Sequence, residues 1–324
     1  MKKCKATPLK HGAKVGVIAP ASSARNPEEV EGAVQLIRTF GLEPVLGRFV
    51  KPGDAVLAGN DRERQADLEE LWRDPEVGAV WALRGGYGCI RLLARLDYRM
   101  VAEQAKILMG YSDITALEMA FWTHSRLVSF HGPVLSGLNS CFSQQLALDM
   151  LLGRVNASRL PWPVNCRESY TVIRGGRARG IILGGNLATL LSLAGTQYFP
   201  DLEGVILFIE EVGEAAYRID RMVSQLRLMG VLEEAAAVIV GKSVPVKEEP
   251  EEALVDVFRQ QLRSLPCPVA YGFPIGHVRE QWTLPQGVLA EVDTELGGFT
   301  LLEQPFGNES PCKRFFPSGA NFPT

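Results

Sequence analysis

Lys106-Ile107-Leu108-Met109-Gly110-Tyr111-Ser112-Asp113-Ile114-Thr115 predicts a buried strand that turns sharply into a helix. Its first half is a short apolar run, and Ile114, Leu117 and Phe121 then recur at helical spacing. A serine at such a junction projects its hydroxyl over the edge of the sheet, while the backbone N–H of the next residue lies near the helix N-terminus. Ser112 is therefore a candidate nucleophile, and the N–H of Asp113 is a candidate donor to an oxyanion.

This turn does not match the usual elbow motif in full, so a second interpretation stays open. The Gly-x-Ser-x-Gly pattern has a glycine two residues after the serine, where this chain has Ile114. On the local pattern alone, Ser112 could instead be simply the N-cap of the following helix, with no catalytic role.

The first 150 residues alternate strand patterns with helix patterns. Asn26-Pro27-Glu28-Glu29, for example, combines an Asn cap, a proline at the first helical position and acids in the first turn. Repeated β-α units imply an α/β protein whose parallel sheet carries helices on both faces. The expected strands are 15–19, 44–46, 79–83, 106–109 and 127–130, and the expected helices are 26–40, 61–72, 90–96 and 113–122.

The pattern changes near residue 150, which suggests two domains. Residues 1–150 form the predicted N-terminal α/β domain, residues 151–178 a connection rich in proline and glycine, and residues 179–324 a smaller C-terminal domain. In the C-terminal part we expect strands at 205–209, 237–240 and 269–272, helices at 188–194 and 217–229, and a hairpin of 288–292 with 299–302. The tail after Pro305 is expected to be an irregular strap or partly disordered.

Composition excludes several classes of protein. The chain has 324 residues, is 46% hydrophobic and carries a formal net charge of −3, so it has no basic footprint for nucleic acid. No apolar run approaches the roughly 18 residues of a membrane span, and the N-terminus lacks the apolar region of a secretory signal. The six cysteines are scattered without a C-x-x-C pair, which argues against a zinc cluster or a disulfide framework and suits the cytoplasm.

A nucleophilic serine needs a base and an orienting acid. Of the four histidines, His277 lies in a turn-rich loop that leaves a strand, whereas His131 fits a structural role at a strand end better than a role in the site. Glu210 and Glu211 end the apolar strand 205–209. Since neighbouring residues at a strand end face opposite ways, at most one of these two glutamates should point into a site, and both could simply lie at the surface.

Two glycine-rich turns could bind a ligand. Arg84-Gly85-Gly86-Tyr87-Gly88 follows a strand, but it matches neither dinucleotide-binding nor P-loop motifs. Its backbone N–H groups could hold a phosphate or, equally, complete an oxyanion hole. Gly184-Gly185-Asn186-Leu187 precedes another helix, where Asn186 is more simply a helix cap than a ligand contact.

In combination and in order, these segments resemble the serine LD-carboxypeptidase family, which includes muramoyl-tetrapeptide carboxypeptidases and microcin-immunity peptidases. The resemblance spans roughly residues 10–305. Its matching motifs are 17–23 (VIAPASS), 84–88 (RGGYG), 110–115 (GYSDIT), 184–187 (GGNL), 201–204 (DLEG) through 217–221 (YRIDR), 272–277 (GFPIGH) and 283–285 (TLP).

The resemblance implies a catalytic triad of Ser112, Glu210 and His277, with Glu211 as the competing acid. It implies an N-terminal domain that is Rossmann-like and glutamine-amidotransferase-like, and a C-terminal mixed α/β domain with a barrel-like or swivelling sheet. The oxyanion hole would combine the N–H of Asp113 with that of Gly85 or Gly86. No metal or organic cofactor is implied. Candidate substrate-binding residues are Arg84, Tyr87, Tyr111, Asn186 and Tyr217.

The implied activity is release of D-alanine from murein tetrapeptide by a cytoplasmic homodimer during cell-wall recycling. Two departures from the family pattern leave more than one peptide substrate open: Glu118 stands where histidine is common, and the loop 277–282 is larger and more charged than expected. One alternative is a microcin-immunity-type peptidase that cleaves an amide next to a nucleotide-like group. Another is a non-catalytic nucleotide or ligand binder, which a fluorophosphonate labelling test would distinguish.

Overall fold

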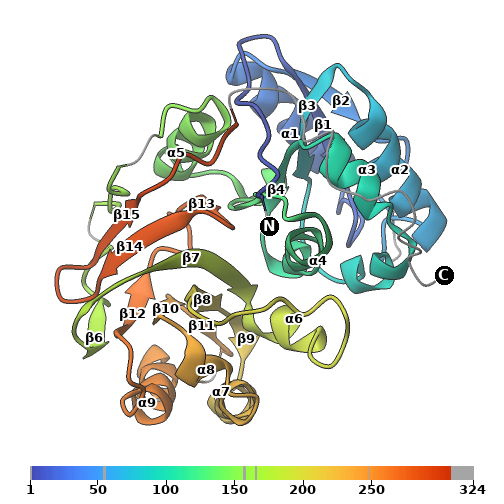
Figure 1. The fold of residues 1–324 in the computed structure, drawn as a ribbon. Helices are drawn as coiled ribbons and strands as arrows, with labels where there is room; N and C mark the ends of the chain where they lie inside the picture. Colours follow the sequence, from blue (N-terminus) through green and yellow to red (C-terminus); the bar gives the residue numbers. More distant parts are fainter. Residues whose placement is uncertain (1, 54–55, 156–157, 165, 248, 308–324) are drawn as a thin grey trace.

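A computed structural model describes residues 2–53, 56–155, 158–164, 166–247 and 249–307 (Figure 1). The chain is an α/β protein with an N-terminal parallel sheet and a C-terminal mixed sheet that curves into a half-barrel. This confirms the predicted fold class, an α/β protein with a parallel N-terminal sheet and a mixed, barrel-like C-terminal sheet. Within the described residues, a small third sheet joins β9 (Val212–Glu214) to β11 (Val244–Pro245).

The N-terminal sheet has the strand order β13-β5-β4-β3-β1-β2. Its first five strands in the sequence are parallel, and β13 pairs antiparallel with β5. The bounds are β1 (Lys14–Ile18), β2 (Glu43–Leu46), β3 (Val77–Ala82), β4 (Ile107–Gly110), β5 (Phe130–His131) and β13 (Leu284–Pro285).

Successive residues of these strands face opposite hydrophobic clusters. In β3, for example, Val80 belongs to one cluster and Trp81 to the other. Helices therefore cover both faces of the sheet, as the β-α pattern predicted. One face is covered by α2 (Asp61–Arg73), α3 (Tyr98–Glu103) and α4 (Thr115–Ser125), and the other by α1 (Pro27–Thr39) and α5 (Cys141–Leu151).

The C-terminal sheet has the order β15-β14-β7-β8-β10-β12-β6. Its four central strands, β7, β8, β10 and β12, are parallel. β14 pairs antiparallel with β7 and β6 with β12, and β15 pairs antiparallel with β14. The bounds are β6 (Thr171–Arg174), β7 (Arg177–Asn186), β8 (Ile206–Glu210), β10 (Ala237–Gly241), β12 (Val269–Phe273), β14 (Leu289–Asp293) and β15 (Gly298–Leu301). The expected hairpin is the antiparallel pair β14–β15.

In Figure 1, α7, α8 and α9 lie below this sheet, and α6 lies at its right-hand end, near α4. The helix α7 forms as its apolar stripe predicted, and Ile219, Val223 and Leu226 of that stripe are buried. The bounds are α6 (Leu187–Ser192), α7 (Ala216–Leu228), α8 (Val231–Glu234) and α9 (Glu251–Leu262).

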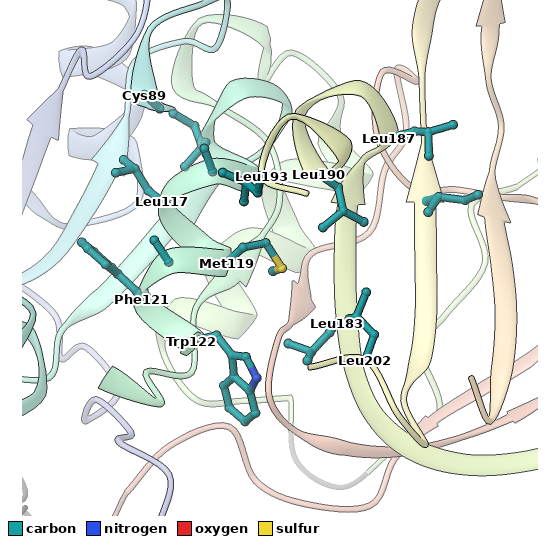
Figure 2. Packing of buried hydrophobic residues seen from close by; sticks show 14 of the residues in the cluster. Cys89, Leu117, Met119, Phe121, Trp122, Leu183, Leu187, Leu190, Leu193 and Leu202 are labelled. Atoms are coloured by element: carbon teal, nitrogen blue, oxygen red, sulfur yellow. The ribbon is translucent and has the colours of Figure 1, made fainter. Parts of the chain in front are cut away.

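The two sheets are joined by a shared core. Figure 2 shows side chains of α4, including Met119, facing Leu183 of β7 and Leu190 of α6. All three residues belong to one buried cluster. The strand β13, which lies far along the chain at residues 284–285, completes the edge of the N-terminal sheet. The junction between the sheets is therefore packed and hydrogen-bonded, so residues from both halves can meet in a fixed geometry.

Two local differences from the expectations stand out. The predicted helix 90–96 is instead two 3-10 turns, Cys89–Arg91 and Leu93–Arg95. Residues 151–178, expected to connect the domains, contain β6 and the start of β7. The tail is described only as far as residue 307, so the expectation for 308–324 falls outside the described residues.

Candidate active site

Ser112 lies in a strained turn directly after β4. Its φ of 64° is in the left-handed region, which only one other non-glycine residue of the described chain adopts. The turn is tight because a Cβ at Gly110 would lie 2.8 Å from Ile114. Ser112 makes no capping hydrogen bond, and the caps of the 3-10 turn and of α4 are Tyr111 and Ile114. The N-cap alternative is therefore wrong, and an elbow is formed without the second glycine.

The glycine-rich loop 84–88 packs against this elbow. A Cβ at Gly85 would lie 3.0 Å from the Ser112 Oγ, so only glycine allows this approach. The buried carboxylate of Asp113 accepts a hydrogen bond from the Cys89 N–H at 2.8 Å and so fastens the loop to the elbow. Burial raises the pKa of Asp113. Arg64, a fully buried side chain that the sequence analysis did not single out, also donates to the Gly88 carbonyl at 2.9 Å.

Glu210 and His277 form a hydrogen-bonded pair. Glu210 is the last residue of β8, and His277 lies in the loop that follows β12. The Nδ1 of His277 lies 2.7 Å from Oε2 of Glu210, whose side chain is fully buried, while the imidazole keeps 18% of its surface exposed. A carboxylate on Nδ1 leaves Nε2 to exchange a proton with a substrate or a nucleophile.

Two glycines make room for this pair. Gly276 has a φ of +87°, and a Cβ there would lie 2.2 Å from the Glu210 carboxylate. A Cβ at Gly241, the last residue of β10, would lie 3.0 Å from the Glu210 Cβ and 2.6 Å from the Ile275 carbonyl. The glycine in front of His277 is thus required by the position of Glu210.

The pair is electrostatically tuned. Burial lowers the pKa of His277, but the hydrogen bond and charge of Glu210 outweigh it, so the pKa lies above its ordinary value. Burial likewise opposes ionisation of Glu210, yet the contact with His277 holds the pKa of Glu210 below its ordinary value. The arrangement favours an ionised glutamate beside a basic imidazole.

Tyr111 brings the two halves of the site together. It immediately precedes Ser112, and its ring centroid lies 4.7 Å from that of His277. Burial and the nearby charge of Glu210 raise the pKa of Tyr111 to about 12, so the phenol stays neutral at physiological pH. The residue that precedes the predicted nucleophile in the N-terminal half therefore contacts the predicted base from the C-terminal half.

Glu211 faces away from this pair. Its carboxylate accepts hydrogen bonds from the Ala188 N–H (2.8 Å), the Val212 N–H (2.9 Å) and the Asn186 side chain (2.9 Å). Asn186 in turn caps α6 by accepting from the Thr189 N–H at 3.0 Å. Glu211 and Asn186 therefore stabilise the start of a helix, which for Asn186 is the simpler of the two roles that the sequence left open.

The remaining candidate substrate residues lie in different surroundings. Arg84 is held by the Ser23 carbonyl at 2.9 Å, and Glu29 lies 3.7 Å from its guanidinium. Tyr87 is exposed on the glycine-rich loop, and Tyr217 is exposed on α7, where Arg221 lies over its ring. The structure places Arg84 and Tyr87 on the loop that touches Ser112 and leaves Tyr217 on a helix surface.

A second buried histidine–glutamate pair lies beneath the elbow. His131 Nδ1 is 3.3 Å from Glu118 Oε2, which also accepts from Gln286 at 2.8 Å, and burial raises the pKa of Glu118. Gln286 accepts from the Gly184 N–H at 3.0 Å, so this network ties α4 and β5 to β7. His131 is fully buried, in agreement with the structural role expected for it. The partnership with Gln286 was not predicted, because nothing in the local pattern links residues so far apart.

Among the residues that the structure covers, no group of three or more His, Cys, Asp or Glu side chains could hold a metal ion. No helix in the same part of the chain has both the length and the apolar character to cross a membrane.

Two family models match the chain. The LD-carboxypeptidase N-terminal domain matches residues 15–132, which include Ser112, and the LD-carboxypeptidase C-terminal domain matches residues 179–292, which include Glu210 and His277. The predicted triad is thus distributed over both matched segments.

Individual proteins are similar over nearly their whole length. A probable murein peptide carboxypeptidase of Bacillus subtilis is 38% identical over 88% of this chain and 90% of its own. The microcin C7 self-immunity protein MccF of Escherichia coli is 28% identical over 94% of this chain and 97% of its own. The crystal structure of muramoyltetrapeptide carboxypeptidase from Oxalobacter formigenes has a TM-score of 0.73 and 29% identity, with 89% of this chain and 98% of that chain covered.

Proposed function

Since the chain belongs to the LD-carboxypeptidase family, we propose that it is a serine carboxypeptidase that releases D-alanine from murein tetrapeptide. The observation that supports the catalytic part is the 2.7 Å contact of His277 with Glu210. The imidazole of His277 also packs against Tyr111, the residue before Ser112. The substrate part rests on the murein peptide named for a relative at 38% identity.

In the proposed mechanism, Ser112 Oγ attacks the carbonyl carbon of the amide between an L-centre and the terminal D-alanine. His277 takes the serine proton as the C–O bond forms, and Glu210 stabilises the resulting imidazolium. The N–H groups of Asp113 and of Gly85 or Gly86 are proposed to hold the oxyanion. His277 then protonates the leaving nitrogen, the C–N bond breaks, and D-alanine departs. Water, deprotonated by His277, hydrolyses the acyl-serine.

The surroundings suit this chemistry. The positive φ of Ser112 and the glycine at position 85 let the backbone of the loop approach the hydroxyl closely, which supports a preorganised set of backbone donors there. Such preorganisation is where most of the rate enhancement of acyl-transfer enzymes arises. We further propose, on the family expectation, that the enzyme works in the cytoplasm as a homodimer in cell-wall recycling.

The microcin-immunity-type peptidase is a second candidate because MccF is similar over almost the whole chain. Both candidates use the same serine, so the substrate decides between them. Purified protein would be given murein tetrapeptide and, in parallel, an aminoacyl sulfamoyl adenosine. A higher kcat/KM for the tetrapeptide is expected, and a clear preference for the nucleotide-like substrate would favour the second candidate.

Labelling with a fluorophosphonate separates either hydrolase from a non-catalytic ligand binder. An activated serine reacts with this probe, whereas a binding protein has no reason to activate Ser112. One stoichiometric adduct on Ser112, located by mass spectrometry, is expected. A protein that resists the probe would support the binder.

Turnover should survive chelation. The proposed mechanism moves protons between Ser112, His277 and Glu210 and assigns no step to a metal ion. After dialysis against EDTA, the rate of D-alanine release is expected to stay within experimental error of the untreated enzyme. Loss of the rate on chelation with recovery on addition of zinc would contradict the serine mechanism.

The pH dependence should report the His277–Glu210 pair. His277 must be neutral to act as a base, and its pKa is raised above the ordinary value, so kcat/KM should fall as the pH drops through that raised pKa. In Glu210→Gln the raising charge is lost while burial remains, so the residual activity should extend to lower pH. An acid limb that stays at the same pH in Glu210→Gln would show that it does not come from His277.

A further inference from the structure

The loop that carries His277, residues 277–282, is held in place by hydrogen bonds and carries charged side chains. Trp282 is fully buried, and its indole donates to the Pro161 carbonyl at 2.6 Å. The Gln281 N–H donates to Ser143 Oγ at 2.9 Å, and this hydroxyl donates to the Arg279 carbonyl at 3.3 Å. The backbone of the loop is therefore held at both the N-terminal helix α5 and the segment before β6.

A cavity of about 490 Å³ opens beside this loop. Its lining combines the imidazole with two cations, one acid and a largely apolar remainder: His277, Arg279, Lys242, Glu280, Cys166, Val244, Gly272, Pro274 and Val278. Glu280 accepts a weak hydrogen bond from the Cys166 thiol at 3.4 Å, and Lys242 lies 3.2 Å from Glu251. Both of these charges thus have a partner within the protein.

Arg279 differs from the other cations near the site. Its side chain is exposed, and none of the ion pairs found in the described chain involves its guanidinium. Arg84, by contrast, is engaged by the Ser23 carbonyl and lies close to Glu29. Arg279 is therefore the cation on the wall of the His277 cavity that remains able to take a ligand anion.

The chemistry of the proposed reaction says which anion that is. His277 must reach the leaving nitrogen to protonate it, so the leaving amino acid lies on the imidazole side of the scissile bond. In a terminal D-amino acid, the carboxylate is attached to the carbon next to that nitrogen. It must therefore fall within a few ångströms of His277, whose side chain lines the same cavity as Arg279.

We propose that the cavity beside His277 is the subsite for the leaving D-amino acid, and that Arg279 binds its terminal carboxylate. The inference rests on the proposed function and adds a specificity determinant to it. A planar guanidinium can hold a carboxylate with two parallel hydrogen bonds, which lysine cannot copy in full. The enzyme would then require a free carboxylate at the end of the peptide.

The test compares murein tetrapeptide with the same peptide ending in D-alaninamide. Wild type should prefer the free acid. Arg279→Met should lower kcat/KM for the acid by about tenfold to a hundredfold, mainly through KM, because one charge-assisted contact is lost. Arg279→Lys should recover part of that loss, and neither variant should change kcat/KM for the amide. Arg263→Met, which removes an exposed arginine at the C-terminal end of α9, is the matched control and should behave as wild type.

The outcomes separate this inference from the proposed function. Equal losses on acid and amide in Arg279→Met would show a general effect of the loop, and unchanged kinetics on the acid would show no role at all; either result overturns the inference alone. If wild type released no D-alanine from the tetrapeptide, the proposed function would fail and this subsite with it.

Discussion

Ser112→Ala is expected to reduce D-alanine release by about a thousandfold or more, as loss of a triad nucleophile does in other serine hydrolases. The fold should be preserved, because the Ser112 hydroxyl accepts no helix-capping hydrogen bond and alanine meets the same backbone strain at a φ of 64°. The rate would be measured with murein tetrapeptide, and the melting temperature would be recorded for the same preparations.

Ser136→Ala provides the matched control, since Ser136 is an exposed serine in a 3-10 turn that precedes α5. It should keep the full rate and the fluorophosphonate adduct, both of which Ser112→Ala should lose. More than a few per cent of wild-type activity in Ser112→Ala would mean that another group attacks the amide.

Glu210→Gln and Glu211→Gln should fail in different ways, although the residues are adjacent. Glu210→Gln is expected to lower kcat by roughly 10²- to 10⁴-fold, because an amide cannot stabilise the imidazolium of His277 and can favour the wrong tautomer. Glu211→Gln should keep kcat near the wild-type value. It should instead lower the free energy of unfolding by about 1–3 kcal/mol, because its carboxylate accepts three hydrogen bonds at the start of α6.

This pair of variants is its own control, since each makes the same chemical change one residue apart. Steady-state kinetics and thermal unfolding of both proteins would be measured side by side. If Glu211→Gln lost the activity and Glu210→Gln the stability, the orienting acid would be Glu211. Small, equal losses of kcat would mean that another group orients His277.

The main elements of the fold could be predicted because the central strands are apolar on both faces. Strands such as β4 and β8 are buried at every residue and therefore read as continuous hydrophobic runs. β13 could not be predicted, because two residues, one of them a proline, carry no strand pattern, and their pairing with β5 depends on how the two halves pack. The helix expected at 90–96 breaks into 3-10 turns where the Cys89 N–H is held by Asp113, a contact that no local pattern encodes.

Some parts of the candidate site could be predicted from the sequence, and others could not. The turn at Ser112 followed from a strand pattern running into a helix pattern, but the pairing of His277 with Glu210 came only from the family resemblance, because the residues are 67 positions apart. The choice between Glu210 and Glu211 needed the geometry, which turns one carboxylate to the imidazole and the other to α6. The reason for the glycine before His277 also appeared only when Glu210 was found against it.

The activity that we propose for this protein is hydrolysis of the terminal amide of murein tetrapeptide by a serine nucleophile. Incubation of the purified protein with the tetrapeptide, followed by quantification of free D-alanine and of the tripeptide product by mass spectrometry, tests it most directly. We expect both products in equal amounts, with a transient acyl adduct on Ser112 in rapidly quenched samples. Intact tetrapeptide after prolonged incubation with folded, fluorophosphonate-reactive enzyme would contradict the assigned substrate.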